Sequence, residues 1–423
     1  MLPTIIQHTP TLLAFLLAIE CALTQPQREH VLNVIEGLIV GQGRKTLSDL
    51  CRLRVGRPDP KAMADTFRES PWTANMIRSP LRHFLVKGAL ALAVRARLKQ
   101  LIFLSLDDSL SVKDKATRHL EGVDWHHDHT ESRPGHPAFK NGMIFLLLRL
   151  HIGPFSFTVD MRLYLREKTV RRLNRGRPKD KRLKFRSKIS LARMMLTDIE
   201  PLIPNDHAVY VLFDSWYAAA RIIKWCRRRK WHVICALRSN RTLNGQKLSF
   251  HNRRLRHKRY EPVTLTTAAD TPRTYAVRAI TGTLTSVPGE VRAFISKRHP
   301  NDRRPRYFMS TDLALSAHRA LSWYQKRWPC EVANFYLKTR LGLGDFRLRS
   351  FEAIEKYHAV CWFALAFLEW RLATNRARFK NLADVIRQER LDHARQTLRA
   401  ACSLAIQTGD VDCVMERFAP MLT

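Results

Sequence analysis

Four short apolar runs in the middle of the chain restrict the fold more than any other feature of the sequence. They cover residues 101–106, 142–151, 155–165 and 209–213, and turn-forming or charged residues bound each of them. A stretch with helical spacing, residues 188–200, separates the third run from the fourth. Three strands followed by a helix and a further strand predict a mixed α/β sheet at the centre of the fold.

The excess of basic residues indicates the class of partner. Of the 423 residues, 73 are Lys or Arg and 37 are Asp or Glu, which gives a formal net charge of +36. Because 45% of the residues are hydrophobic, this charge is not that of a disordered tail, and the chain can bury cores beneath a positive surface. Nucleic acid is therefore the expected partner, whereas small-molecule metabolism and secretion are not expected.

The cysteines and the first apolar run indicate a cytoplasmic location. The eight cysteines include no Cys-x-x-Cys pair, which fits neither a zinc ribbon nor a disulfide scaffold. The apolar run at residues 12–19 is too short to span a bilayer and leads directly into Glu20, so we expect a buried helix rather than a signal peptide. The sequence also has no GxxxxGK[ST] loop, so no nucleotide cofactor is expected.

The spacing of apolar residues divides the chain into five parts. Residues 1–99 predict a helical domain that either inserts a helix into a DNA groove or caps the next domain. Residues 100–231 and 313–375 predict the two halves of an α/β core, separated by a β-rich insertion over residues 232–312. A helix over residues 216–230 is expected before this insertion, and residues 376–423 predict a helical C-terminal region.

Two aspartates directly follow predicted strands. Asp108, preceded by Asp107, comes after the run at 101–106, and Asp214 comes after the run at 209–213. The carboxyl ends of strands in α/β sheets carry ligand-binding side chains, so both positions are candidates for a functional site. A turn or a helix cap is the commoner role of either aspartate taken alone.

Glu331 is the third acidic candidate, in the segment YQKRWPCEVANFYLK at residues 324–338. On a regular helix its spacing places Tyr324, Arg327, Glu331 and Lys338 within about 60° of one another, so the four share one face. Pro329 lies inside this span and costs a helical hydrogen bond, which leaves open whether the helix is kinked there. Apolar residues alternate with the four polar ones: Trp328, Val332, Phe335 and Leu337. This pattern predicts that the helix packs its apolar side and aims the polar residues at a crevice.

Three carboxylates from separate elements repel one another unless cations lie between them. Oxygen ligands suit Mg²⁺ or Mn²⁺, and two such ions about 3.5 to 4 Å apart activate a water or a 3′-hydroxyl at a phosphodiester. Arg and Lys bind phosphate, Arg through a bidentate fork and Lys as a point charge. The chemistry offered by the acids therefore agrees with the polyanion partner that the charge indicates.

The motifs carrying these residues resemble one family. The spacing Tyr-x2-Arg-x3-Glu-x6-Lys resembles the YREK signature of the cut-and-paste DDE transposases of bacterial insertion sequences. The phrases LDDS at 106–109 and LFDSWY at 212–217 resemble its two aspartate motifs, and LGLGDFRLRS at 341–350 resembles the sequence that follows the signature. The similarity covers residues 101–368 and implies a ribonuclease H-like core with a β-rich insertion before the glutamate.

The resemblance also implies an activity: a transposase that binds transposon ends as a homodimer and catalyses metal-dependent cleavage and strand transfer of double-stranded DNA. It implies that Asp108, Asp214 and Glu331 hold two Mg²⁺ ions. It also implies that Tyr324, Arg327 and Lys338 bind phosphates near the cut. Asp108 stands directly before Ser109 and is the expected first acid, while Asp107 remains open because neighbours on a strand face opposite ways. Two alternatives are a non-catalytic DNA-binding protein derived from a transposase and a nuclease that only hydrolyses.

Two further segments have candidate ligands. Residues 162–193 contain fourteen Lys or Arg, and the sequence RGRPK at 175–179 resembles a minor-groove hook formed by Arg175, Arg177 and Lys179. A solvated basic loop that touches phosphates is the alternative. The histidines at 126, 127, 129 and 136 have no spacing of a known zinc site, so a loop beside the first acid is favoured over metal binding.

Overall fold

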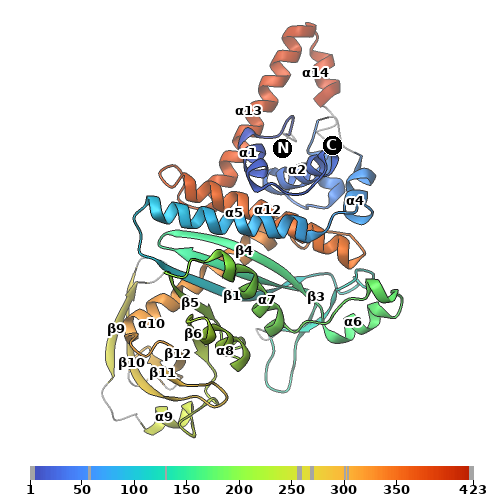
Figure 1. Cartoon of the computed structure of the whole chain (residues 1–423). Helices are drawn as coiled ribbons and strands as arrows, with labels where there is room; N and C mark the ends of the chain where they lie inside the picture. Colours follow the sequence, from blue (N-terminus) through green and yellow to red (C-terminus); the bar gives the residue numbers. More distant parts are fainter. Residues whose placement is uncertain are drawn as a thin grey trace.

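The computed structural model describes residues 5–55, 59–128, 131–254, 260–266, 271–299, 302 and 304–418. Within them, ten strands form one mixed sheet, with helices on both of its faces (Figure 1). A second, two-stranded sheet is formed by β7 (Thr242–Leu243) and β8 (Gln246–Lys247). The fold is thus mixed α/β, as the apolar runs predict.

The centre of the sheet has the ribonuclease H-like order β4-β3-β1-β5-β6. The first three strands are antiparallel: β1 (Leu101–Val112), β3 (Phe139–Ile152) and β4 (Phe155–Tyr164). A two-residue turn joins β3 to β4, and its first residue, Gly153, has a φ of +54°, which glycine adopts without strain. The other two strands, β5 (Ala208–Phe213) and β6 (His232–Leu237), run parallel to β1.

The β-rich insertion extends this sheet instead of forming a separate layer. Its strands β9 (Glu261–Thr266), β10 (Pro272–Thr283), β11 (Glu290–Lys297) and β12 (Arg306–Ser310) are antiparallel neighbours, and β12 pairs with β6. A short helix, α9 (Leu248–Arg254), precedes them. The first strand of the expected insertion, β6, therefore belongs to the core sheet, because it pairs in parallel with β5.

Helices cover the two faces unequally. One face carries α5 (Ala74–Arg95), α7 (Lys188–Ile199), α8 (Ala220–Arg228) and α12 (Phe351–Thr374), whereas α10 (Ala317–Tyr324) packs on the other face beside β6, β9 and β10. The helix expected over residues 216–230 is shorter than predicted, because the residues after Asp214 first form a turn held by its carboxylate. No helix among the described residues is long and apolar enough to cross a membrane.

The N-terminal helices share a core with α12. They are α1 (Pro10–Ile19), α2 (Gln25–Val40), α3 (Leu47–Arg52) and α4 (Pro60–Arg68). Nearly all of α12 is buried, in keeping with a sequence that is apolar on every side, since α2, α4 and α5 contact it on one side and β4 on another. The described residues up to 99 are thus mainly helical, as predicted, but they pack directly on α12 and the sheet.

The C-terminal region is a helical hairpin. It consists of α13 (Leu382–Thr408) and α14 (Val411–Phe418), and its tip extends away from the rest of the molecule (Figure 1). Gly409, with a φ of +63°, ends α13 in the left-handed conformation that a glycine adopts at a helix end.

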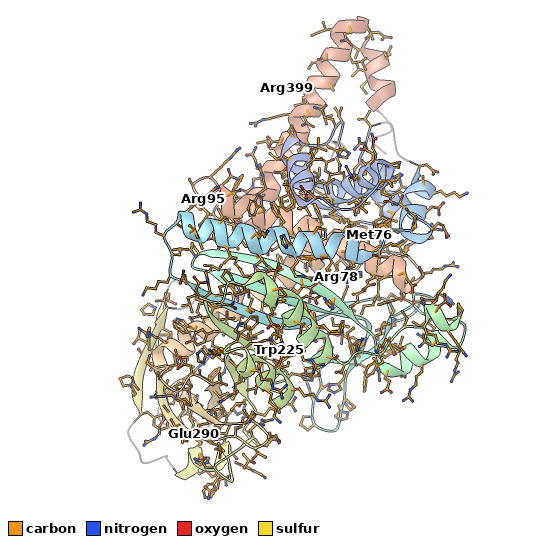
Figure 2. All side chains as sticks on the ribbon, in the orientation of Figure 1. Met76, Arg78, Arg95, Trp225, Glu290 and Arg399 are labelled. Atoms are coloured by element: carbon orange, nitrogen blue, oxygen red, sulfur yellow. The ribbon has the colours of Figure 1, made fainter. Side chains whose placement is uncertain are left out.

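Buried ion pairs join α5 to the sheet. The carboxylate of Asp160, on β4, is fully buried and lies 3.1 Å from Arg82 and 3.0 Å from Arg162. Arg78 is 3.8 Å from the same carboxylate and points from α5 toward the sheet, whereas Arg95, at the other end of the helix, points away from it (Figure 2). The cluster therefore fixes the position of α5.

We expect Asp160→Ala to destabilise the protein by about 3 to 5 kcal/mol, because it removes the buried carboxylate that the three arginines share and leaves them only the partly exposed Asp198 and Glu355. Urea unfolding followed by circular dichroism measures the loss. Glu167→Ala is the control, since it breaks the exposed pair of Glu167 with Arg171 and should change the stability little. Equal stabilities of the two variants would contradict a structural role for the cluster.

Candidate active site

The candidate aspartates lie on the neighbouring strands β1 and β5. Asp214 directly follows β5 as expected, whereas β1 continues to Val112, so Asp107 and Asp108 lie within the strand and not after it. Ser105 of β1 pairs with Leu212 of β5 in parallel register, so Asp107, two residues further, is level with Asp214. Side chains two residues apart on a strand point to the same face. Asp107 therefore shares the face of Ser105, whereas Asp108 points to the opposite face.

The segment that carries Glu331 crosses β1 on the face of Ser105. The Ser105 hydroxyl donates a hydrogen bond to the Lys326 carbonyl at 3.2 Å. Arg327 then contacts two carboxylates: its Nη1 is 2.8 Å from Asp107 Oδ2, and its Nη2 is 3.5 Å from Glu331 Oε1. Arg327 thus links β1 to the third acidic candidate.

Asp108 has different partners. Its carboxylate accepts hydrogen bonds from Lys188 Nζ at 2.7 Å and from the Tyr217 hydroxyl at 2.8 Å. Lys188 is the first residue of α7, and Tyr217 lies in the turn after β5. Sequence reasoning gave neither residue a role, although Tyr217 belongs to the quoted LFDSWY phrase and Lys188 to the basic segment.

The carboxylates of the site perturb one another. Burial raises the pKa of Asp107 to about 7, opposed by Arg327 and reinforced by Glu331, Asp108 and Asp214. Burial also raises the pKa of Asp214, although the backbone N–H groups after it, at residues 216 and 217, stabilise its charged form. The Arg327 guanidinium responds in the opposite direction: burial would lower its pKa, but the neighbouring Asp107 raises it overall.

The helix expected across residues 324–338 is broken into segments. After α10 ends at Tyr324 come a 3₁₀ turn (Gln325–Arg327), α11 (Pro329–Phe335) and a π-helical turn (Tyr336–Arg340). Proline has no N–H to donate, so Pro329 begins a new helix rather than continuing the old one. The four signature residues therefore do not lie on one regular helix face.

The apolar side of this segment was predicted to be packed, and that prediction is wrong for three of its four residues. The side chains of Trp328, Val332 and Phe335 are exposed, by 58, 41 and 46% of their surface, while Leu337 is buried. Even a regular helix would put Trp328, Val332 and Phe335 within about 80° of Tyr324, beside the signature residues, so these three share the open side of the segment while Leu337 lies on its packed side.

The remaining signature residues lie near the same carboxylates. Burial raises the pKa of Tyr324 to about 12, and its ring contacts Phe308 with centroids 4.9 Å apart. Lys338 donates a hydrogen bond to the Ser109 hydroxyl at 2.9 Å; burial lowers its pKa, opposed by Glu331 and Asp107. The structure thus brings Arg327 into direct contact with Asp107 and Glu331, and Lys338 into contact with Ser109 on β1.

The three residues of the expected minor-groove hook differ in their surroundings. Arg175 and Lys179 are exposed. Arg177 is 2.7 Å from Glu121 and also pairs with Glu352, so its guanidinium is occupied within the protein. Only the outer two are free to meet a ligand in this arrangement.

The described residues contain no group of three His, Cys, Asp or Glu side chains arranged to hold a metal ion. At the site, Arg327 and Lys188 occupy positions between or beside the carboxylates. The donor set nevertheless suits a hard cation, since it consists of carboxylate oxygens that raise one another's pKa. Metal binding there requires the cationic side chains to exchange their carboxylate partners.

The histidine segment contains a strand where a loop was predicted. It forms β2 (Asp124–His127), which pairs with β3. His126 is buried, and burial lowers its pKa to about 4, while His127 Nε2 is 3.0 Å from the Ser132 hydroxyl. His129 lies outside the described residues.

The sheet order, with aspartates on β1 and directly after β5, defines the class of the protein as ribonuclease H-like. Residues 19–286 match the family model described as DDE superfamily endonuclease. This match covers more than half of the chain, so the chain belongs to that family, whose members act on DNA with divalent metal ions. The matched region includes both aspartate positions and ends before Glu331. No curated protein matches the chain.

We expect the metal-free protein to lose stability as the pH rises from 5 to 8, because the folded state holds the Asp107 proton more tightly than the unfolded chain does. This stabilisation is fully present below the unfolded pKa near 4 and is lost as the pH passes through about 7. Urea unfolding in a chelator at both pH values measures it.

Asp107→Asn removes the titrating group, so this variant should lose less stability between pH 5 and pH 8 than the wild type. Asp180→Asn, which changes an exposed aspartate, is the control and should follow the wild type. Identical pH profiles of Asp107→Asn and wild type would show that Asp107 does not titrate in this range.

Proposed function

We propose that the chain is a transposase that cleaves DNA at transposon ends and joins the freed 3′-hydroxyl groups to target DNA. The observation that carries the proposal is the position of Arg327, which contacts both Asp107 on β1 and Glu331 of the YREK-like segment. This contact connects the signature, which lies outside the matched family region, with the aspartates inside it. The resemblance to the bacterial cut-and-paste superfamily supports the same function.

We assign the three metal-binding acids as Asp107, Asp214 and Glu331. The sequence favoured Asp108, but Asp107 is level with Asp214 and shares a guanidinium with Glu331. Asp108 faces Lys188 and Tyr217 instead, which suits a residue that positions α7 and the turn after β5. When bound, Mg²⁺ or Mn²⁺ ions supply the polarisation of the reacting oxygens at the phosphodiester.

The basic residues of the site bind and orient the substrate. Once its carboxylate partners turn toward a cation, Arg327 is free to bind a phosphate through its guanidinium fork, and Lys338 is placed to provide a point charge nearby. Tyr324, with a raised pKa, stays protonated at neutral pH and can donate its hydroxyl proton to a phosphate oxygen. The three side chains with these roles, Arg327, Lys338 and Tyr324, all belong to the signature.

Arg175 and Lys179 contact DNA phosphates outside the active site, because both are exposed in a segment that is rich in Lys and Arg. Arg177 has a different role: it anchors the segment to Glu121 and to Glu352 at the start of α12. Uniform phosphate contacts explain this arrangement better than a hook that inserts all three side chains.

The proposed activity also requires an assembly. Two ends must meet before insertion, so two copies of the chain assemble on DNA, each cutting one end. The charge of +36 opposes association of the free protein until DNA neutralises it. The place of action is the bacterial cytoplasm, at the nucleoid.

The acid assignment predicts a pattern of cleavage losses. Asp107→Asn, Asp214→Asn and Glu331→Gln should each lose at least about 10²- to 10³-fold in cleavage rate, because they remove stabilisation of the transition state. Asp108→Asn is the matched control and should lose less than about tenfold. The assay incubates each protein with Mg²⁺ and DNA that carries the element's own ends, and gels resolve excised and joined products.

The reverse pattern, with Asp108→Asn inactive and Asp107→Asn active, would assign the first metal ligand to Asp108. Full activity of Asp214→Asn or Glu331→Gln would contradict a transposase. Cleavage without joined products would favour a nuclease that only hydrolyses, and binding without cleavage by the wild type would favour a non-catalytic protein.

The basic segment predicts a difference in salt dependence. Arg175→Ala with Lys179→Ala should reduce the slope of log affinity against log salt by up to about 0.9 per lost phosphate contact, without changing thermal stability. Arg177→Ala should instead lower the melting temperature, because it leaves Glu121 and Glu352 without their shared partner. Fluorescence anisotropy across a salt series and thermal unfolding measure the two effects. An unchanged slope in the double variant would remove the segment from the DNA-binding surface.

A further inference from the structure

The sheet face that carries Asp107 continues into a groove at the insertion. One hollow of about 860 Å³ begins at the signature segment, at Tyr324, Arg327 and Trp328, and extends over β9 to β12. A second hollow of about 480 Å³ lies beside it. The two hollows form one groove, because four of their lining residues are shared: Arg273, Tyr275, Ser296 and Arg306.

Strand register shows that the groove and the acids lie on the same face. Paired residues of neighbouring strands point to the same side of a sheet, and the pairs continue without a break from β1 to β12. Ser105 pairs with Leu212, Leu212 pairs with Ile234, and Ile234 pairs with Ser310. Two residues further along β6 and two residues earlier in β12, Ala236 pairs with Phe308 on the same face. Arg306 lies two residues before Phe308 and pairs with Ser296, so both share this face.

The groove is strongly basic. Arg273 and Arg306 are exposed, and neither has a hydrogen-bond or ion-pair partner among the described residues. Lys297, Arg298 and Arg304 line its outer half. Within the described part of the chain, Asp302 is the one acidic residue on the lining, and its carboxylate accepts from backbone N–H groups, one of them that of Arg304 at 2.9 Å.

Aromatic side chains lie among these charges. Tyr275 lines both hollows, and Tyr324, Trp328 and the largely buried Phe308 line the hollow that begins at the signature segment. A positively charged groove with aromatic rings is the arrangement that binds single-stranded nucleic acid, since phosphates meet the cations and unpaired bases stack on the rings. Paired bases inside a duplex have no free faces for such stacking.

We propose that this groove binds a single DNA strand that leads away from the cleavage site. The inference rests on the proposed function, which places the scissile phosphate at Asp107 and Arg327. Five strand steps separate β1 from β10, which at about 4.8 Å per step gives about 24 Å. A strand entering at Arg327 therefore passes Phe308 and Arg306 before it reaches Tyr275 and Arg273.

The test compares two DNA probes without chemistry. One is a blunt duplex, and the other is the same duplex with a thymidine tail of about eight nucleotides; anisotropy is measured in Ca²⁺ at several salt concentrations. We expect wild-type protein to bind the tailed duplex at least about tenfold more tightly than the blunt one, because one stacked base alone contributes that order of affinity. The tail should add to the salt slope by up to about 0.7 per contacted phosphate.

The double variant Arg273→Ala with Arg306→Ala should abolish the preference for the tail. The matched control, Arg95→Ala with Arg399→Ala, removes the same charge from α5 and α13, distant from the groove (Figure 2), and should keep it. Tyr275→Leu should reduce the preference by about fivefold or more at an unchanged salt slope, since it removes stacking and no charge. Equal melting temperatures of all variants confirm that they are folded.

Equal affinity of wild type for both probes would overturn the inference. So would an equal loss on both probes in the groove variant, which would assign Arg273 and Arg306 to duplex binding. Because the assay measures binding alone, its outcome is independent of the cleavage test: a protein that cuts but ignores the tail refutes only the groove, and one that prefers the tail but never cuts refutes only the proposed function.

Discussion

The contact of Arg327 with Asp107 and Glu331 is the interaction on which the acidic end of the sheet depends. A buried aspartate on β1 is unfavourable in its charged form, and three more carboxylates, those of Glu331, Asp108 and Asp214, raise its pKa further. A guanidinium between Asp107 and Glu331 lets β1 and α11 approach without a metal ion. The same contact explains why the break at Pro329 is tolerated, since Arg327 holds the 3₁₀ turn against the strand.

Much of the fold was predictable, because each element there follows from local pattern. The strands of the core appear where apolar runs of strand length occur, and Asp214 follows its strand as expected, with its carboxylate capping the next turn. The β-rich insertion and the helical ends are likewise present. The apolar pattern of the sequence does not show which strands become neighbours. The pairing of β12 with β6, which makes the sheet continuous, therefore could not be predicted.

The site was predictable in composition but not in geometry. Residue types and spacing predicted candidate acids and signature cations, yet a spacing argument assumes a regular helix, and the segment breaks at Pro329. Partners from distant parts of the sequence, such as Glu352 for Arg177 and Lys188 for Asp108, depend on tertiary structure and have no local signal.

Continuous hydrogen bonding between neighbouring strands from β1 to β10 fixes the position of the insertion relative to the acids. Because β12 is bonded to β6 and β6 to β5, the separation of the insertion strands from β1 across the sheet follows from hydrogen-bonded steps of about 4.8 Å each. A flexible linker in place of these hydrogen bonds would let the insertion move relative to the acids. The continuous sheet instead limits how many nucleotides can lie between a bond held at β1 and a base held at β10.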